Sequence, residues 1–250
     1  MGQSSDNFSD GNFTQNPAWN GDVSNFITNA SNQLQSNGPN TTAIISLATP
    51  NILALNAEWT FYVEMNFNPS SSNYARVYLT ADQQNLAGNL NGYYVQIGNR
   101  SDAIDLVKQS GTTNTRIIEG ISNRVNTSAP KTRVKVTRDF EGNWTLAADT
   151  LGGTNYKPEG TGSDASFATS AFSGLSCIFT ATRRQGFFFD DFEVKTANFQ
   201  PPVPVNYKDV VITEIFPDES PRVDLPEKEF VEIFNRSTKD IKLGGFVFAD

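Results

Sequence analysis

The chain has 250 residues, a formal net charge of −8 at pH 7, no histidine and one cysteine. Without histidine, Ser-His-Asp and Cys-His catalysis and zinc sites built on His or Cys clusters are excluded, and a single cysteine cannot form an intrachain disulfide. The pI of about 4.6 argues against nucleic-acid and anionic-membrane partners, which need clustered Lys and Arg. No stretch approaches the 18 or more apolar residues of a membrane span, so no membrane insertion is expected.

The remaining composition favours an all-β protein. Charged residues make up 18% of the chain, Phe occurs 19 times, and Asn, Ser, Thr and Gly are abundant. Asn and Gly serve turns, whereas Thr and Phe serve strands. The polar start Met1–Asp6 fits either a cytoplasmic protein or the mature end of an exported one. We favour the second, because all-β chains of this composition are typical of secreted or cell-surface proteins.

Alternating apolar and polar residues predict a series of short strands. The clearest is 60–67, where every second residue from Phe61 to Phe67 is apolar. Val134 and Val136 share a face with Trp144 and Leu146 on a predicted hairpin. Such strands without crossover helices indicate antiparallel sheets packed face to face. The other predicted strands are 75–80, 93–97, 103–108, 115–119, 133–138, 143–148, 177–182 and 187–194.

A proline-rich segment divides the chain. Residues 200–206 read Gln-Pro-Pro-Val-Pro-Val-Asn, which enforces an extended path and cannot lie inside a central strand. We therefore expect one domain at 3–199, a linker at 200–206 and the beginning of a second domain at 207–250.

The order of several motifs in 6–195 resembles the concanavalin A-like (laminin G-like) jelly-roll module of large exported bacterial surface proteins. This resemblance implies that the first and last strands lie side by side. It also implies a protein that is exported by type IX secretion. The motifs are Asp-Asn-Phe-Ser-Asp-Gly-Asn-Phe at 6–13, Pro-Ala-Trp-Asn-Gly-Asp at 17–22, Gly-Tyr-Tyr-Val-Gln-Ile-Gly at 92–98, Val-Thr-Arg-Asp at 136–139, Gly-Asn-Trp-Thr-Leu at 142–146 and Phe-Phe-Phe-Asp-Asp-Phe-Glu-Val at 187–194.

A second resemblance follows the linker. Predicted strands at 209–215 and 229–235, then 240–250 with Leu-Gly-Gly-Phe at 243–246, are similar to the opening of a lamin-tail domain, an immunoglobulin-like sandwich. The match covers about 44 residues, whereas such sandwiches need about 100. Either the sequence is part of a longer chain, or this half-domain packs on the first domain. We expect 207–250 to be poorly supported by a core of its own.

No pair of carboxylates satisfies the spacing of a glycoside hydrolase. Such enzymes place two carboxylates roughly 5–10 Å apart. Glu58 and Glu64 share a strand face but lie about 20 Å apart at the rise of a strand. We therefore assign no catalytic residue and expect a protein that is not an enzyme.

A calcium site is the main candidate for a cofactor. Calcium takes six to eight oxygen ligands from carboxylates, amides and carbonyls. Asp6, Asp10, Asp190 and Asp191 would approach one another if the terminal strands pair as the resemblance implies. The alternative interpretation is that Asp10 opens a turn and that Asp190 and Asp191 form a solvated strand end.

Carbohydrate binding is the function that the fold resemblance implies. Sugars stack on aromatic rings, and we select Trp19, Tyr74 and Tyr94 as candidates, with both tyrosines expected to be exposed. Trp59 and Trp144 are expected to have a core or rim role, and Cys177 is interpreted as a core residue. The Phe187–Phe189 run predicts either a central strand covered on both faces or a partner patch. Asp-Thr-Leu around Thr150 resembles a periplasmic O-glycosylation acceptor.

Together these features favour a non-catalytic module for adhesion or glycan recognition, at the front of a larger type IX-secreted protein. Its expected partners are glycans or other surface proteins, and the resemblance adds the secretion machinery. Two alternatives stay open. The chain could supply accessory domains to a secreted hydrolase or nuclease, or it could be a structural cargo domain without a ligand.

Overall fold

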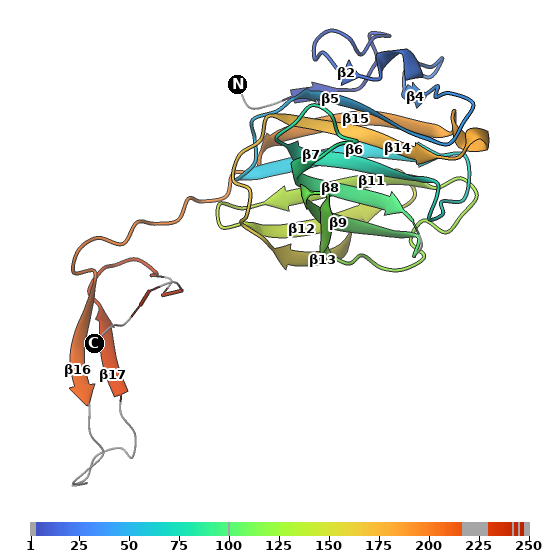
Figure 1. Ribbon diagram of the computed structural model, residues 1–250. Helices are drawn as coiled ribbons and strands as arrows, with labels where there is room; N and C mark the ends of the chain where they lie inside the picture. Colours follow the sequence, from blue (N-terminus) through green and yellow to red (C-terminus); the bar gives the residue numbers. More distant parts are fainter. Residues whose placement is uncertain (1–3, 100, 217–229, 242, 245, 248–250) are drawn as a thin grey trace. The chain divides into compact units, whose positions relative to one another are not determined.

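The computed structural model describes residues 4–99, 101–216, 230–241, 243–244 and 246–247. The chain splits into two compact units, Met1–Phe199 (unit 1) and Gln200–Asp250 (unit 2), and each is described by itself (Figure 1). The division falls where the proline-rich segment begins. In the part of the chain that is described, no helix has the length and apolar character to cross a membrane.

Unit 1 is an antiparallel β-sandwich of two sheets, which confirms the all-β fold class. Each sheet combines strands that are consecutive in sequence with neighbours that are distant, such as β6 beside β15 and β7 beside β14, as expected for a jelly roll. The eight-stranded sheet runs β13 (Lys157–Ser163), β12 (Asn143–Asp149), β11 (Lys131–Arg138), β6 (Ala57–Met65), β15 (Phe187–Thr196), β4 (Leu34–Ser36), β3 (Phe26–Thr28), with β1 (Ser4–Asp6) beside β15. The seven-stranded sheet runs β10 (Thr113–Ile118), β9 (Ala103–Gly111), β8 (Leu90–Gly98), β7 (Tyr74–Ala81), β14 (Phe172–Phe179), β5 (Ala43–Pro50), β2 (Asn20–Gly21).

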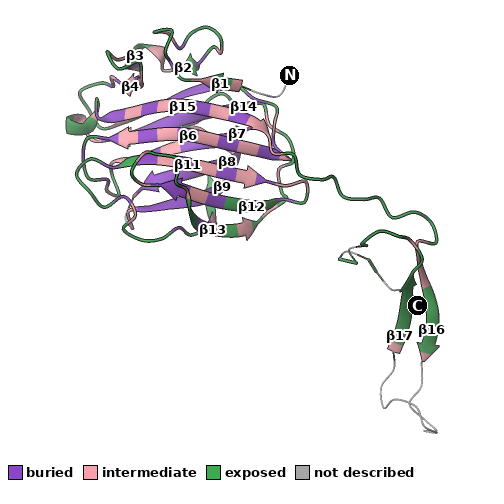
Figure 2. Ribbon diagram, turned by 180° about the vertical axis from the view of Figure 1, so that it is seen from behind, coloured by how far each residue is buried: buried purple, intermediate pink, exposed green. Residues whose placement is uncertain are grey.

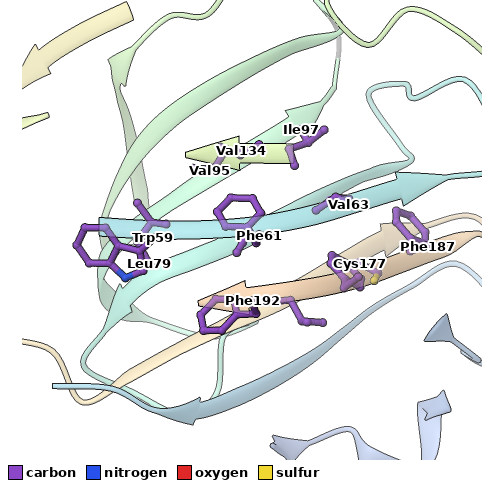
Figure 3. Close-up of a cluster of buried hydrophobic side chains, with 14 of the residues drawn as sticks. Trp59, Phe61, Val63, Leu79, Val95, Ile97, Val134, Cys177, Phe187 and Phe192 are labelled. Carbon is purple, nitrogen blue, oxygen red and sulfur yellow. The ribbon is translucent and has the colours of Figure 1, made fainter. Parts of the chain in front are cut away.

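The core lies between the two sheets. Burial alternates with period two along β6, so the eight-stranded sheet has one buried and one partly exposed face (Figure 2). Trp59 of β6 and Trp144 of β12 stack with ring centroids 5.8 Å apart, which confirms them as core residues. Cys177 is also fully buried among apolar side chains, as expected (Figure 3). The predicted shared face of Val134, Val136, Trp144 and Leu146 is confirmed, because all four are buried in this cluster.

The first and last strands of unit 1 pair, as the resemblance implies. Ser4 lies opposite Val194 and Asp6 opposite Phe192 in an antiparallel register. The expectation that the Phe187–Phe189 run is covered on both faces is wrong. Phe187 and Phe189 are buried, but Phe188 between them is only half-buried on the outer face.

Several strand boundaries differ from the prediction. The strand expected at 177–182 is β14, which ends at Phe179 and is followed by a 3₁₀ turn at Ala181–Arg183. β5 was not predicted, because five of its eight residues in succession are buried and its sequence lacks the alternation of a half-buried strand. Strands β1 to β4 have only two or three residues each, too few to carry a periodic pattern.

In unit 2, two predicted strands are present as β16 (Val210–Phe216) and β17 (Phe230–Asn235), which pair antiparallel. Phe216 and Phe230 stack at one end with centroids 5.5 Å apart. The third predicted segment, 240–250, lies partly outside the described residues, and its lamin-tail assignment stays a prediction.

Candidate functional site

The seven-stranded sheet presents a row of polar and aromatic side chains on its outer face. Because side chains alternate along a strand, Tyr74, Arg76 and Tyr78 of β7 point away from the core formed by their neighbours Ala75, Val77 and Leu79. The register places Arg76 opposite Gln96 of β8. The strands involved, β7, β8 and β9, lie side by side in Figure 1.

One half of this outer face is covered by a second apolar cluster, which we call the outer cluster. Leu86, in the connection between β7 and β8, packs there against Tyr78 and Tyr94. This cover explains why β8 is buried on both faces, unlike the strands of the opposite sheet. The members of the outer cluster are Ala48, Tyr78, Ala81, Leu86, Leu90, Tyr94 and Val107.

The uncovered half of the face forms a groove of about 420 Å³, which we call the β7–β10 groove. Its walls and floor consist of aromatic rings, guanidinium groups and side-chain amides, and they contain few purely apolar groups. It is lined by Tyr74, Arg76, Tyr94, Gln96, Asn99, Val107, Asn114 and Arg116.

Arg76 is the central group of the groove. Its guanidinium carbon lies 4.8 Å from the ring centroid of Tyr94 and 5.5 Å from that of Tyr74. Nη2 donates a hydrogen bond of 3.2 Å to the hydroxyl of Tyr74, whereas the buried Nε has no partner in the described part of the chain. Burial raises the pKa of Tyr94 to about 12, so this ring stays a neutral phenol.

The second arginine of the groove is neutralised. Arg116 Nε lies 3.0 Å from Oδ2 of Asp105, whose side chain is 2% exposed. Oδ1 of the same carboxylate accepts a hydrogen bond from the backbone N–H of Gly120 at 2.9 Å. Burial nevertheless raises the pKa of Asp105 above its ordinary value. Asn114 at the rim accepts a hydrogen bond from the Tyr94 hydroxyl at 3.1 Å.

The structure brings together two of the three residues expected to bind a sugar. Tyr74 is half-buried and lines the groove, but the expected exposure of Tyr94 is wrong, because it is 1% exposed beneath Arg76 and beside Tyr78. Trp19 lies elsewhere and is also 1% exposed, packed between Phe8 and Phe192. A ring that is covered on its faces cannot stack on a sugar, so Trp19 is a core residue.

The residues expected to bind calcium line a second hollow, of about 460 Å³, near β1 and β15. Asp6, Asp10 and Asp191 line it, but Asp190 lines a separate, much smaller void. The described residues contain no group of three acidic side chains close enough to hold a metal. Arg133 explains part of this result, because its Nη2 lies 2.7 Å from Oδ2 of Asp191 and supplies the positive charge itself.

Local hydrogen bonds occupy the other carboxylates. Asp6 accepts from the backbone N–H of Phe8 and the indole N–H of Trp19, each at 2.8 Å. Asp10 accepts a hydrogen bond from the backbone N–H of Asn12 at 3.0 Å. This contact fits the alternative interpretation, in which Asp10 opens a turn. Burial raises the pKa of Asp190 to about 6. In the described residues, Asp191 is therefore ion-paired, and Asp6, Asp10 and Asp190 each accept a hydrogen bond from a backbone N–H group.

The remaining candidates lie on the surface of unit 1. Glu58 is ion-paired to Lys135 at 2.8 Å, and Glu64 accepts a hydrogen bond from the Tyr62 hydroxyl at 2.8 Å. Both lie on the outer face of the eight-stranded sheet. Thr150 is half-buried in the turn between β12 and β13, next to Leu151, which is 88% exposed.

Sequence reasoning did not identify most of the residues that line the groove, among them Arg76, Gln96 and Asn114. The available signal was the alternation of side chains along β7, which places Arg76 between Tyr74 and Tyr78 on the face that points away from the core. Gln96 could not be found in this way, because its position beside Arg76 depends on the register between two strands.

Comparisons with known proteins support the fold. No protein-family model matches the sequence, and no curated protein matches it. Among solved structures, the exoplasmic/lumenal domain of VIP36 in a Ca²⁺/Man2-bound form is similar, with a TM-score of 0.56 and 10% identity, covering 80% of this chain and 89% of that chain. The carbohydrate recognition domain of Emp47p has a TM-score of 0.55 and 11% identity, covering 77% and 92%.

Unit 1 has a jelly-roll β-sandwich fold. A xylan β-1,4-xylosidase from Bacillus halodurans C-125 contains a similar region, with a TM-score of 0.52 and 15% identity. That similarity covers 77% of this chain but 39% of the xylosidase chain. At these identities the comparisons establish the fold alone, and the ligand has to be argued from the site.

Proposed function

We propose that unit 1 is a non-catalytic glycan-binding module and that the β7–β10 groove receives the glycan. The observation that carries this proposal is the composition of the groove. An open hollow lined by the half-buried ring of Tyr74, by arginine and by side-chain amides offers one aromatic ring for a sugar together with donors and acceptors for its hydroxyl groups.

The fold and the chemistry of the groove support the same conclusion. Two similar structures are a carbohydrate recognition domain and a domain in a mannose-bound form. The groove has no pair of free carboxylates, because its buried acid Asp105 is held by Arg116 and the Gly120 N–H. A binding function therefore fits the groove better than hydrolysis does.

Glycan-array binding with the full chain tests this proposal, followed by titration calorimetry on the best ligands. Asn114→Ala removes an exposed amide at the rim and should weaken binding about tenfold while the fold is kept. Lys157→Ala, an exposed position on β13 of the other sheet, is the control and should bind normally. Array binding that survives Asn114→Ala together with Gln96→Ala would place the site elsewhere.

A second candidate is an accessory module of a secreted glycoside hydrolase. The similar region in the xylosidase accounts for a minority of that chain, which favours a module joined to other domains. In either case we propose a secreted or cell-surface location. Type IX export, a lamin-tail identity for 207–250 and O-glycosylation at Thr150 belong to the same proposal. Intact-mass measurement of the protein from its natural host checks the modification.

A further inference from the structure

Arg76 is half-buried, and its charge has no counter-ion in the described part of the chain. Arg138, Arg183 and Arg184 also lack a counter-ion there, but Arg138 and Arg184 donate to backbone carbonyls and Arg183 is exposed. Arg133 pairs with Asp191, and Arg124 pairs with Glu159 at 2.6 Å. Arg138 is buried, but its nitrogens donate to three backbone carbonyls. Arg76 is half-buried, contacts two aromatic rings, and forms its hydrogen bonds with the phenol hydroxyls of Tyr74 and Tyr78.

A half-buried cation without a counter-ion is a costly arrangement. Buried charges in proteins are normally paired, because removing them from water without a partner is unfavourable. Stacking on Tyr94 offsets part of this cost. It also keeps the guanidinium group at the lining of the groove, where it can donate hydrogen bonds to a planar anion such as a carboxylate.

From this arrangement we propose that the groove selects acidic glycans and that Arg76 binds the carboxylate of a uronic acid residue. The inference rests on the proposed glycan-binding function and specifies its ligand class. Arg116 does not offer the same charge, since Asp105 already holds it at 3.0 Å. The groove therefore carries one available positive charge, beside neutral amides for the hydroxyl groups.

Those amides lie where a saccharide needs them. Gln96 is directly across from Arg76 in the β7–β8 register, and Asn114 is on β10, two strands beyond β8. At about 4.8 Å between strands, β7 to β10 spans about 14 Å, which suits a short oligosaccharide better than a free anion. The net charge of −8 does not prevent binding, because it is screened beyond about 8 Å at physiological salt.

The test uses the full chain, titrated with oligogalacturonate and hyaluronan fragments, each beside its carboxyl-reduced counterpart. We expect at least one acidic fragment to bind about tenfold or more tightly than its reduced counterpart. Raising the salt concentration should weaken binding of the acid alone. Arg76→Gln should abolish the preference and leave the weak binding of the reduced sugar, and Arg76→Lys should keep part of the preference.

Arg133→Gln is the matched control, because Arg133 also lies over a tyrosine, 5.6 Å from the Tyr62 ring centroid, but on the opposite sheet and paired to Asp191. It should retain the full preference. Equal binding of acid and reduced sugars, or a preference that survives Arg76→Gln in a folded variant, overturns the inference but leaves glycan binding intact. Binding of sulfated glycans without uronates overturns the carboxylate assignment. Absence of binding to any glycan overturns both proposals.

Discussion

Trp19 donates its indole N–H to the carboxylate of Asp6 across 2.8 Å. Trp19 was expected to stack on a sugar and Asp6 to bind calcium. Instead, the indole N–H and the carboxylate are hydrogen-bonded to each other. The Trp19 ring also contacts Phe192 edge-on at 5.3 Å. The contact therefore fastens the loop that follows β1 to β15, the last strand of unit 1, and its role is structural.

The first prediction compares two buried tryptophans. Trp19→Phe should destabilise the protein by about 1–2 kcal/mol more than Trp59→Phe, because Trp19 loses a hydrogen bond to a charged acceptor. Trp59 is 0% exposed and its Nε1 has no partner in the described part of the chain, so the same substitution there removes no hydrogen bond. Urea unfolding of both variants measures the difference. Equal losses would mean that the Asp6 contact contributes nothing, and glycan binding should be unchanged in both.

The second prediction concerns Asp190 and pH. Burial raises its pKa to about 6 from 3.8, so the folded protein binds more protons than the unfolded chain between these values. Stability from this group therefore falls as pH rises from about 4 to 6. Asp190→Asn should stabilise the protein by about 1 kcal/mol at pH 7, after allowance for solvent screening, and by almost nothing at pH 4.

The Asn side chain keeps the oxygen that accepts the Asp191 N–H at 2.8 Å, so the substitution changes charge without removing this contact. Thermal melts of the variant and the parent at pH 4, 5, 6 and 7 measure the effect. A stability difference that is constant across this range would contradict the raised pKa of Asp190.

Arg138 supplies the third prediction. It is 0% exposed and donates to the carbonyls of Ala54, Phe167 and Asp164, with its guanidinium carbon 4.7 Å from the Trp144 ring centroid. Arg138→Lys should cost about 2–4 kcal/mol, because one ammonium cannot reach three carbonyls spread over a planar fork. The measurement is chemical denaturation.

A surface cation provides the control for Arg138. Lys135 pairs with Glu58 at 2.8 Å but is 38% exposed, so Lys135→Met should change stability by about 0.5 kcal/mol or less. If Arg138→Lys is equally mild, the buried carbonyls must have other donors.

The fourth prediction is that calcium does not stabilise unit 1. The described residues contain no cluster of three acids, and Arg133 already neutralises Asp191. The melting temperature should be the same with millimolar calcium and after chelator treatment. A bound ion at 100 times its dissociation constant would contribute about 2.7 kcal/mol and raise the melting temperature by several degrees, which would restore the calcium hypothesis.

The alternation of apolar and polar residues was sufficient to predict the strands that have one exposed face. The alternation around Phe61 and that around Val134 predicted β6 and β11, because a half-buried strand repeats every two residues. It was not sufficient for β5, which is buried continuously. The burial of Trp19 depends on contacts with Phe8 and Phe192, and the second of these is 173 positions away in the sequence.

The groove is the least local feature of all. Arg76 meets Gln96 only because β7 and β8 pair in one particular register, and a slip of one residue would turn Arg76 toward the core. Tyr94 was expected at the surface because nothing in its neighbourhood shows that Leu86 and Arg76 cover it. Sequence patterns therefore indicated which face of β7 is polar, but they did not indicate which residues of the neighbouring strands join that face to form the groove.

The last prediction concerns unit 2. Its two described strands form a two-stranded sheet with apolar side chains exposed, including Ile215 at 55% and Phe234 at 56%. Isolated two-stranded sheets are at most marginally stable in water, since they bury little apolar surface. Backbone amides of β16 and β17 should therefore exchange with solvent at least about 100-fold faster than those of β6 and β11, which lie in the middle of a packed sheet. Hydrogen exchange followed by mass spectrometry, with fragments from both units in one sample, provides the internal control. Equal protection in the two units would show that the exposed apolar face of β16 and β17 is covered in solution, as the docking alternative for 207–250 requires.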